Sequence, residues 1–514
     1  MSRALIFGLL LALAAALALR CPQLDIRPMH NDEAVNAIKL RTLWEQGSYK
    51  YDPQEYHGPT LIYLTFAWMK LIGPVQFAHF DEIQLRLITV IFGVGLILFL
   101  PLISDALGRG AIVCAAILIA VSPAMVFYSR YFIHEMLLVA FTFLTIAAGW
   151  RYTRNRKPGW AVLAGVSIGL MQATKETFVL SIAAAVAAIF LNKLCNRDPN
   201  ETANVFSLNR QHLIAAIAAW FITVIVLFTS FFTNARGPLD AVLTYFPWLH
   251  RVEGASPHLH PWDYYLSRLI YFHSGRGPVW SEALVLILAI VGIIAAFNPK
   301  SRLEGNRKFI RFIALYTIIL TAIYSAISYK TPWCLLSFWQ GMILLAGVGA
   351  MALINLGSQF IWKIPVSCVL LALTVQLAYQ AWQVSVPYAS NIHNPYIYAQ
   401  TSDDILNLVE RLDKLAPTDA QKNSFVIKVM APDSEYWPLP WYLRQFKQVG
   451  FWPRVPADPY SDAMIVSTAF QANLDQKKTH IMAGLFELRP QTFFELYVET
   501  NAWTTYVNGA QRSQ

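Results

Sequence analysis

Two adjacent carboxylates, Asp32 and Glu33, follow a histidine, His30, shortly after the first apolar segment of the chain. A carboxylate in this position could act as a general base on a hydroxyl or amine acceptor. His30 could tune the acid or bind a metal ion. The alternative is structural, because Asn31 and Asp32 are good capping residues for a helix that begins here. The pattern alone leaves both interpretations open.

A second group of ionisable residues precedes the apolar run that begins near Met136. It contains Arg130, His134 and Glu135 within six residues. A glutamate at a helix N-terminus has a simple electrostatic explanation, and a lone arginine is often a membrane-interface anchor. The grouping of all three residue types nevertheless indicates a functional cluster.

Lys175 and Glu176 lie between two apolar halves of one hydrophobic stretch. Ionisable residues in such a place are costly and are usually functional. Lys175 would suit a phosphate as a point charge, and Lys330 offers a similar cation at the start of another apolar run. The alternative is a Lys–Glu pair at a short turn that reaches the interface. His57 is a further candidate, just before an apolar run.

The composition indicates a membrane protein. The chain has 514 residues, of which 56% are hydrophobic and 14% are charged, whereas soluble domains carry about 25% charged residues. The net charge of +9 does not predict nucleic-acid binding, because the excess Lys and Arg lie mostly in short loops, as membrane topology requires. Five cysteines are too few and too scattered for a disulfide framework.

Apolar runs of roughly 20 residues predict about eleven membrane-spanning helices. The predicted spans are 3–20, 86–104, 110–127, 136–150, 160–174, 177–193, 212–232, 281–297, 309–328, 333–354 and 364–384. The run 58–73 is short for a span and carries Lys70. The fold class is therefore an α-helical polytopic membrane protein.

Charge bias in the loops predicts the topology. The loops 151–157 and 299–311 are rich in Lys and Arg, so both should be cytoplasmic. With the N-terminus inside, this requires 58–73 to lie on the outer surface as a juxtamembrane helix. The outer loops are then 21–85 and 233–280, and the candidate residues gather on the outer face.

The sequence predicts two domains, a transmembrane domain over 1–386 and a small extracytoplasmic α/β domain over 387–514. The second has no spanning run. It should contain an amphipathic helix over 401–415 and a short helix within 436–444. Short β-rich runs follow at 424–430, 463–466, 480–488 and 493–498.

Taken together, these pieces resemble the polyprenyl-phosphate-dependent glycosyltransferases of the C superfamily, the protein mannosyltransferase and aminoarabinose transferase group. Within that group the chain is most similar to the flippase-activity-associated membrane protein family of archaea and bacteria. The segments that carry the resemblance are Met29–Ala34, His57–Leu61, Arg86–Ile88, Ser122–Leu138, Ala173–Thr177 and Tyr436–Arg444. The resemblance covers essentially the whole chain and implies a helical bundle with an outward-facing active site under long loops.

The resemblance also implies roles for single residues. Asp32 takes the position of the first-loop catalytic acid, and Glu135 stands where relatives often have aspartate. The expected site residues are catalytic Asp32, Glu33 and Glu135, with substrate-binding His30, His57, Arg130, His134, Lys175, Glu176 and Lys330. Of these, Lys175, Arg130 and Lys330 would hold the lipid phosphate. Because many mannosyltransferases lack a histidine at position 134, a divalent metal ion held by His30, Asp32, His134 and Glu135 is left open, and no other cofactor is expected.

The expected function is transfer of a sugar from a polyprenyl-phosphate donor to a protein, lipid or glycan acceptor at the outer face of the plasma (inner) membrane. Asp32 would be the general base, and the reaction would invert the configuration at C1 of the sugar. The expected process is glycosylation at the cell envelope. No nucleic-acid partner is expected. The alternative is a flippase, or a flippase accessory, for lipid-linked sugars, because transporters also carry intramembrane charges.

Overall fold

The computed structural model describes residues 2–54, 57–195, 209–250, 258–356 and 360–512. It divides into two compact units. The helical unit comprises Met1–Leu24, Ser48–Ala67 and Arg86–Tyr396, and the α/β unit comprises Asp25–Gly47, Trp68–Leu85 and Ile397–Gln514. The division therefore comes after Tyr396 rather than after 386, and two pieces of the predicted outer loop 21–85 belong to the α/β unit.

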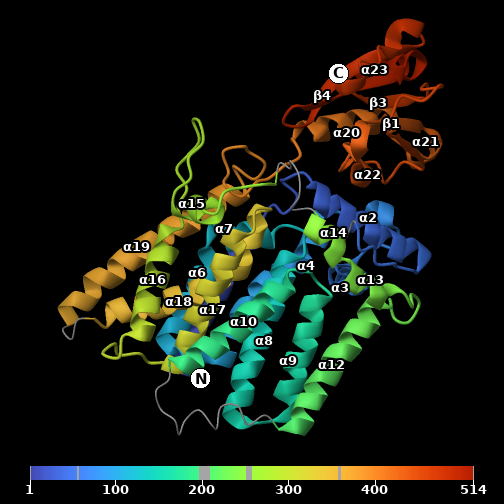
Figure 1. The fold of residues 1–514 in the computed structure, drawn as a ribbon. Coiled ribbons are helices and arrows are strands. Elements are labelled where there is room, and N and C mark those ends of the chain that lie inside the picture. Colours follow the sequence, from blue (N-terminus) through green and yellow to red (C-terminus); the bar gives the residue numbers. More distant parts are fainter. Residues whose placement is uncertain (1, 55–56, 196–208, 251–257, 357–359, 513–514) are drawn as a thin grey trace. The chain divides into compact units, whose positions relative to one another are not determined.

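Among the described residues, seven helices are long and apolar enough to cross a membrane. Five of them are single helices: α1 (Arg3–Arg20), α8 (Glu135–Asn155), α12 (Arg210–Phe228), α17 (Arg307–Ala326) and α19 (Phe360–Ser385) (Figure 1). The sixth, Glu82–Leu107, consists of α4 (Glu82–Phe99), η2 (Leu100–Ile103) and α5 (Ser104–Leu107). The seventh, Pro332–Ile354, consists of η3 (Pro332–Leu335) and α18 (Leu336–Ile354). The helices α6 (Arg109–Val121) and α7 (Pro123–Ser129) form an eighth span if they count together, with a 58° bend between them.

The described residues also contain four shorter apolar helices: α3 (Thr60–Ile72), α9 (Pro158–Gln172), α10 (Phe178–Leu194) and α16 (Ala283–Phe297). Every predicted span is thus helical, because backbone groups in lipid must be satisfied within their own segment. The prediction of a polytopic helical protein is confirmed. The predicted eleven correspond to the seven long helices, the bent pair, and the short helices α9, α10 and α16. The predicted juxtamembrane run is α3.

Small residues allow the helices to pack closely. A Cβ on Gly349 of α18 would lie 1.9 Å from the carbonyl oxygen of Leu288, and one on Gly292 of α16 would lie 2.1 Å from that of Leu345. The backbones of α16 and α18 therefore approach each other at both glycines, as small residues permit in membrane helices.

The predicted outer loops contain short helices. The segment 25–47 holds α2 (Asn31–Gln46), and 68–85 holds η1 (Phe77–His79). The loop 233–280 holds α13 (Gly237–Leu243), α14 (Tyr245–His250) and α15 (Tyr264–Ile270). Residues 251–257 of that loop lie outside the described residues.

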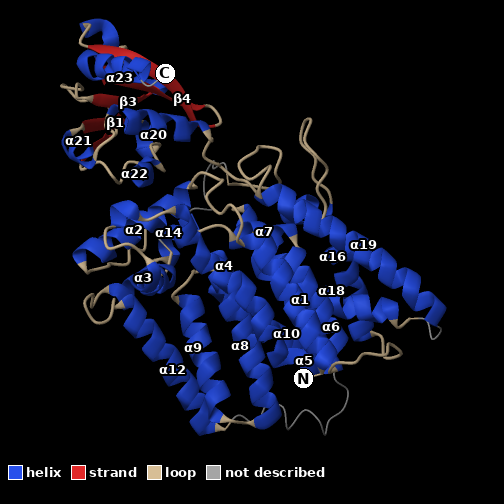
Figure 2. Ribbon diagram, turned by 180° about the vertical axis from the view of Figure 1, so that it is seen from behind, coloured by secondary structure: helices blue, strands red, loops and turns tan. Residues whose placement is uncertain are grey.

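The α/β unit contains a five-stranded mixed sheet with strand order β2-β1-β3-β5-β4. The strands are β1 (Val426–Met430), β2 (Gln448–Trp452), β3 (Ala463–Ser467), β4 (His480–Arg489) and β5 (Thr492–Glu499) (Figure 2). Strand β1 pairs in parallel with β2 and β3, whereas β5 pairs antiparallel with β3 and β4. The accompanying helices are α20 (Asp404–Leu415), α21 (Asp419–Ser424), η4 (Pro432–Ser434), α22 (Leu439–Tyr442), η5 (Thr468–Phe470), η6 (Leu474–Lys477) and α23 (Thr500–Arg512).

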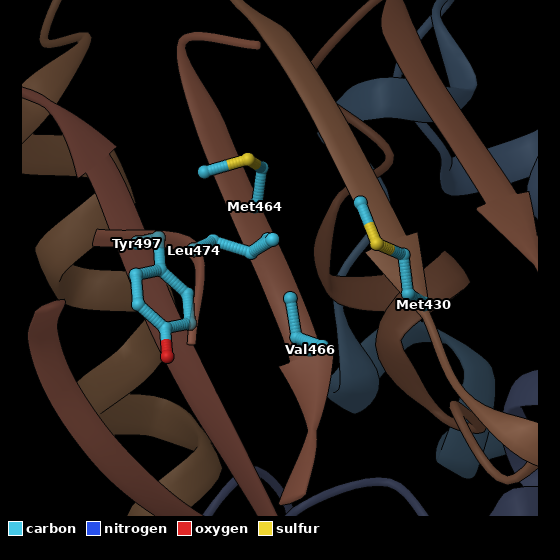
Figure 3. Close-up of a cluster of buried hydrophobic side chains, with 5 residues drawn as sticks. All are labelled: Met430, Met464, Val466, Leu474 and Tyr497. Carbon is cyan, nitrogen blue, oxygen red and sulfur yellow. The ribbon is translucent and has the colours of Figure 1, made fainter. Parts of the chain in front are cut away.

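A buried apolar cluster packs on one face of this sheet. It joins Met430 of β1, Met464 and Val466 of β3, Tyr497 of β5, and Leu474 of η6 (Figure 3). Four of these side chains come from the three central strands, so the cluster ties the parallel and antiparallel halves of the sheet together.

The predicted helix and four strands of the tail occur within a few residues of their expected positions. The short helix predicted within 436–444 is α22, of four residues. Strand β2 was not predicted, because its residues are exposed or half-buried and show no clear alternation. The helices α21 and α23 were also missed.

Candidate active site

The Asp32 segment opens helix α2. The helix begins at Asn31, and its capping residue is His30, whose Nδ1 accepts a hydrogen bond from the Asp32 N–H at 3.1 Å. The Glu33 carboxylate accepts a hydrogen bond from the His30 N–H at 2.9 Å, which completes a capping box. The capping interpretation is therefore correct for the segment, but with His30 as the cap rather than Asn31 or Asp32.

The two adjacent carboxylates have different surroundings. Glu33 is fully buried, and both of its oxygens lie 3.2 Å from Nη2 of Arg27. The Asp32 side chain is 51% exposed, and its carboxylate lies 4.0 Å from His30 Nδ1. That nitrogen accepts the Asp32 N–H, while Nε2 lies 2.9 Å from the Tyr398 carbonyl, so the contacts fit a neutral imidazole. Asp32 thus presents the accessible carboxylate, and Glu33 holds the helix start.

In the helical unit, Lys175 forms a buried ion pair with Glu135. Lys175 lies in the turn between α9 and α10, and Glu135 is the first residue of α8. Burial alone would lower the pKa of Lys175, but Cys334 and the adjacent Glu135 carboxylate together outweigh burial, and the pKa lies above its usual value. The pair fastens the turn to α8.

Glu176, the next residue, has separate partners. Its carboxylate lies 2.8 Å from Nδ1 of His57 and accepts a hydrogen bond from the Tyr51 hydroxyl at 3.3 Å. Burial raises the pKa of Glu176, but His57 and the backbone outweigh burial, so the pKa is lower than usual. Lys175 and Glu176 do not pair with each other, so the simple turn pair considered from the sequence is wrong.

His134 lies against the same segment. Its Nε2 is 3.2 Å from the Gly58 carbonyl, and its ring meets His57 edge-to-face with centroids 5.2 Å apart. Burial, together with the neighbouring His57 and Lys175, lowers the pKa of His134 well below 6.5, so the ring is neutral at pH 7. The structure thus brings together five predicted site residues, at positions 57, 134, 135, 175 and 176.

A backbone contact fixes this arrangement. The Gly58 N–H donates to the Thr174 carbonyl at 3.2 Å, and the Thr60 N–H donates to the Ala173 carbonyl at 2.9 Å. A Cβ on Gly58 would lie 2.2 Å from the oxygen of Ala173. Glycine is therefore needed for the two backbones to approach each other.

Arg130 is engaged by the chain itself. Its guanidinium donates to the carbonyls of Arg20 at 2.9 Å, Pro22 at 2.6 Å, Gln23 at 2.7 Å and Ser385 at 3.3 Å. Three of these carbonyls lie at or just after the C-terminus of α1, where a cation is favourable. In this arrangement Arg130 fastens α1 to α19, and its predicted contact with a phosphate stays a prediction.

Lys330 and Arg268 are two cations that both lie near His260. Lys330 is 1% exposed, and its Nζ donates to the carbonyls of His260, at 3.3 Å, and Ile327. Among the described residues it forms no ion pair. Burial lowers the pKa of Lys330, and Asp263 partly opposes that effect.

Arg268 is the second cation near His260. Its guanidinium lies over the Tyr264 ring, 4.2 Å from the centroid, and that ring stacks on His260 at 4.0 Å. Its buried Nε has no hydrogen-bond partner among the described residues. The sequence prediction missed Arg268, although an arginine inside the aromatic run 262–272 was a usable signal.

Glu282 was also missed. This buried carboxylate accepts hydrogen bonds from the Ser122 hydroxyl at 2.5 Å, the Ala124 N–H at 2.8 Å and the Tyr396 hydroxyl at 2.6 Å. Burial raises its pKa, and these hydrogen bonds partly oppose the rise. Glu282 therefore secures the bend between α6 and α7, and its signal was an acid directly before the apolar run 283–297.

A metal ion held by His30, Asp32, His134 and Glu135 was left open by the sequence. Across the described ranges, no three His, Cys, Asp or Glu side chains lie close enough together to hold a metal ion. His30 and Asp32 belong to the α/β unit, whereas His134 and Glu135 belong to the helical unit.

Comparisons with known proteins address the fold and the family. A family model described as dolichyl-phosphate-mannose-protein mannosyltransferase matches residues 57–227. The crystal structure of ArnT from Cupriavidus metallidurans bound to undecaprenyl phosphate is similar with a TM-score of 0.63 at 15% identity, over 95% of this chain and 97% of that chain. The chain therefore has the same fold as this ArnT structure.

Other solved structures share this fold. The oligosaccharyltransferase AglB from Archaeoglobus fulgidus, in complex with an inhibitory peptide and a dolichol-phosphate, has a TM-score of 0.56 at 12% identity, over 86% of this chain and 63% of that one. The arabinofuranosyltransferase AftD from Mycobacteria has a TM-score of 0.50 at 12% identity, over 97% of this chain and 40% of that one. A comparison with curated protein sequences gives no match. The chain is thus a multi-pass membrane protein with a glycosyltransferase fold.

Proposed function

We propose that this protein transfers a sugar from a polyprenyl-phosphate donor to an acceptor at the outer face of the plasma (inner) membrane. The observation that carries the proposal is the similarity to undecaprenyl-phosphate-bound ArnT over nearly the whole of both chains. The match of residues 57–227 to a mannosyltransferase family model supports the same reaction class. The N-terminus would be cytoplasmic and the α/β unit extracytoplasmic.

Asp32 is the proposed general base. Of the two adjacent acids, it is the one that is half-exposed and not held in a buried ion pair. It would take the proton from the acceptor hydroxyl or amine as the acceptor oxygen or nitrogen bonds to C1 of the sugar. The bond between C1 and the phosphate oxygen breaks, and its electron pair leaves with the polyprenyl phosphate. Attack opposite the leaving group inverts the configuration at C1.

Cations would stabilise the leaving phosphate as its negative charge grows. Lys330 is the best placed of the three predicted cations, because carbonyls rather than a carboxylate hold it. Arg268 would contribute a second charge, with Nε as a donor that has no partner among the described residues. Lys175 and Arg130 remain candidates, but each would first have to release Glu135 or its backbone carbonyls.

The remaining predicted residues would line or support the substrate site. The His57 side chain is 30% exposed, and the Glu176 carboxylate orients its ring. His57 could therefore donate to a sugar hydroxyl or a phosphate oxygen. His134 and Glu135 would hold this arrangement from α8, and His30 would hold the Asp32 loop.

The experiment uses the full-length protein in proteoliposomes. A radiolabelled polyprenyl-phosphate mannose serves as donor, the host's membrane extract serves as acceptor, and transfer and translocation are scored together. We expect transfer, and we expect Lys330→Met to lower it by at least about tenfold, the effect of losing roughly 1.4 kcal/mol of transition-state stabilisation. The matched control is Lys300→Met, at an exposed lysine of the loop predicted to be cytoplasmic.

Two outcomes would contradict the proposal. Translocation of the donor without transfer of its sugar would favour the flippase alternative. Equal transfer by the wild type, Lys330→Met and Lys300→Met would remove Lys330 from the phosphate site.

A further inference from the structure

Both backbone polar groups of Met29 are held by side chains from the C-terminal part of the α/β unit. The Met29 N–H donates to the Tyr442 hydroxyl oxygen at 2.8 Å, and the Met29 carbonyl accepts from the Thr401 hydroxyl at 2.7 Å. All three residues are buried. Met29 lies just before α2. The two hydroxyls supply the hydrogen bonds that a buried backbone requires.

The neighbouring backbone is held in the same way. The Pro28 carbonyl accepts from Nε2 of Gln400 at 3.2 Å, and Nε2 of His30 lies 2.9 Å from the Tyr398 carbonyl. The segment 398–401 therefore runs along residues 28–30. This contact lies wholly within the α/β unit, although the two segments are far apart in sequence.

The first residue of α2 has a third attachment. In the orientation that satisfies both amide atoms, Asn31 donates to the Trp437 carbonyl at 3.0 Å and accepts from Nη1 of Arg489 at 2.6 Å. Nη2 of Arg489 donates to the Glu435 carbonyl at 3.1 Å. The loop after β1 and the end of β4 thus hold the residue directly before Asp32.

We propose that Tyr442 and Thr401 are positioning residues for the Asp32 carboxylate. Their hydroxyls fix the backbone at Met29, and Met29 leads directly into the His30 cap and the first turn of α2. Asp32 lies in that turn, so its direction follows from the backbone before it. This inference rests on the proposed function, because it gives Asp32 the role of base. It makes the C-terminal segment part of the catalytic apparatus rather than an appended domain.

The size of the expected effect follows from the geometry. A misplacement of about 1 Å at a catalytic group can lower the rate on the order of 100-fold. Loss of one hydroxyl leaves the other attachments of residues 28–31 in place. We therefore expect each single substitution to lower kcat by about tenfold, and the two together by more.

The variants are Tyr442→Phe and Thr401→Val, which remove one hydroxyl each and keep the shape of the side chain. Thr401→Ser keeps the hydroxyl and should therefore keep the kcat of the wild type. The matched controls are Tyr497→Phe, whose hydroxyl bonds Glu495, and Thr468→Val, whose hydroxyl bonds the Phe493 carbonyl.

Two measurements are made on the full-length protein in detergent, with radiolabelled polyprenyl-phosphate mannose as donor and host membrane extract as acceptor. The first is kcat and the KM for the donor. The second is amide hydrogen exchange of the peptide that covers Met29–Ala34. We expect the two test variants to have a lower kcat, an unchanged donor KM and faster exchange, and the two controls to match the wild type. The KM comparison separates positioning from a general loss of structure, which would change both constants.

Unchanged exchange in Tyr442→Phe and Thr401→Val would overturn the proposal, and so would faster exchange with a wild-type kcat. If Tyr442→Phe does not fold, the positioning role is tested by comparing kcat and amide exchange between Thr401→Val and Thr401→Ser. The proposed function is tested separately by Asp32→Asn. An inactive Asp32→Asn with fully active Tyr442→Phe and Thr401→Val would contradict the positioning role alone, whereas a fully active Asp32→Asn would contradict the base assignment.

Discussion

Replacing Glu33 with alanine should destabilise the α/β unit. The substitution leaves the buried guanidinium of Arg27 without its carboxylate, since the side chains are 5% and 0% exposed. Breaking a buried ion pair from one side costs about 3–5 kcal/mol. The loss of the capping bond to the His30 N–H adds about 1 kcal/mol. At roughly 2–4 °C per kcal/mol for a cooperative unit of this size, the melting temperature should fall by about 10 °C or more.

The assay is thermal unfolding of the full-length protein in detergent, followed by tryptophan fluorescence. Glu45→Ala is the matched control on the same helix. Its partner Arg41 lies 2.9 Å away, but both side chains are more than 40% exposed. An exposed pair of this kind contributes about 0.2–0.5 kcal/mol, so the control should melt within about 1–2 °C of the wild type.

The double variant Arg27→Met/Glu33→Leu tests the same pair. Removing both charges should restore most of the stability that Glu33→Ala loses, because neither charge is then left buried alone. The reasoning is refuted if Glu33→Ala melts like the wild type while sugar transfer is abolished. Glu33 would then act on the substrate, as its catalytic assignment from the sequence predicts.

Further predictions concern the helical unit. Burial lowers the pKa of His134 below 6.5. Below pH 6.5 the unfolded chain therefore binds a proton that the folded chain does not. The free energy of unfolding should then decrease by up to about 1.4 kcal/mol for each unit by which the pH is lowered. His134→Gln should flatten this slope in unfolding curves between about pH 5 and 6.5. Gly58→Ala should lower the melting temperature, because its Cβ would lie 2.2 Å from a backbone oxygen, whereas Gly159→Ala, with no atom within 4 Å, should not. Glu135→Gln should cost about 3–5 kcal/mol by leaving Lys175 buried and unpaired; equal melting of this variant and the wild type would contradict the pairing.

The sequence predicted the helices of the membrane part well, because a span must be apolar along its whole length and needs few partners elsewhere in the chain. Its predicted α/β tail was also correct in type. The division into units was harder to predict. Residues 25–47 and 68–85 belong with 397–514 through contacts such as Met29 with Tyr442, and such pairings leave no local pattern in a sequence.

The candidate site shows the same limit. Residue types and spacing selected Asp32, Glu135, Lys175 and Glu176, but they could not tell which groups would pair. Lys175 and Glu176 are adjacent in sequence, yet the first pairs with Glu135 and the second with His57. The different burial of Asp32 and Glu33 was also hidden, because the turn of a helix separates neighbours that a sequence presents together. The assignment of catalytic and phosphate-binding roles stays a prediction.

The most direct test of the central claim is the turnover number of Asp32→Asn for transfer from radiolabelled polyprenyl-phosphate mannose. Loss of a general base lowers the rate by about 10²–10⁴-fold, and we expect a decrease in this range with an unchanged melting temperature. Asp419→Asn, an exposed acid in the first turn of α21, should keep the wild-type rate. An Asp32→Asn protein that transfers the sugar as fast as the wild type would contradict the account.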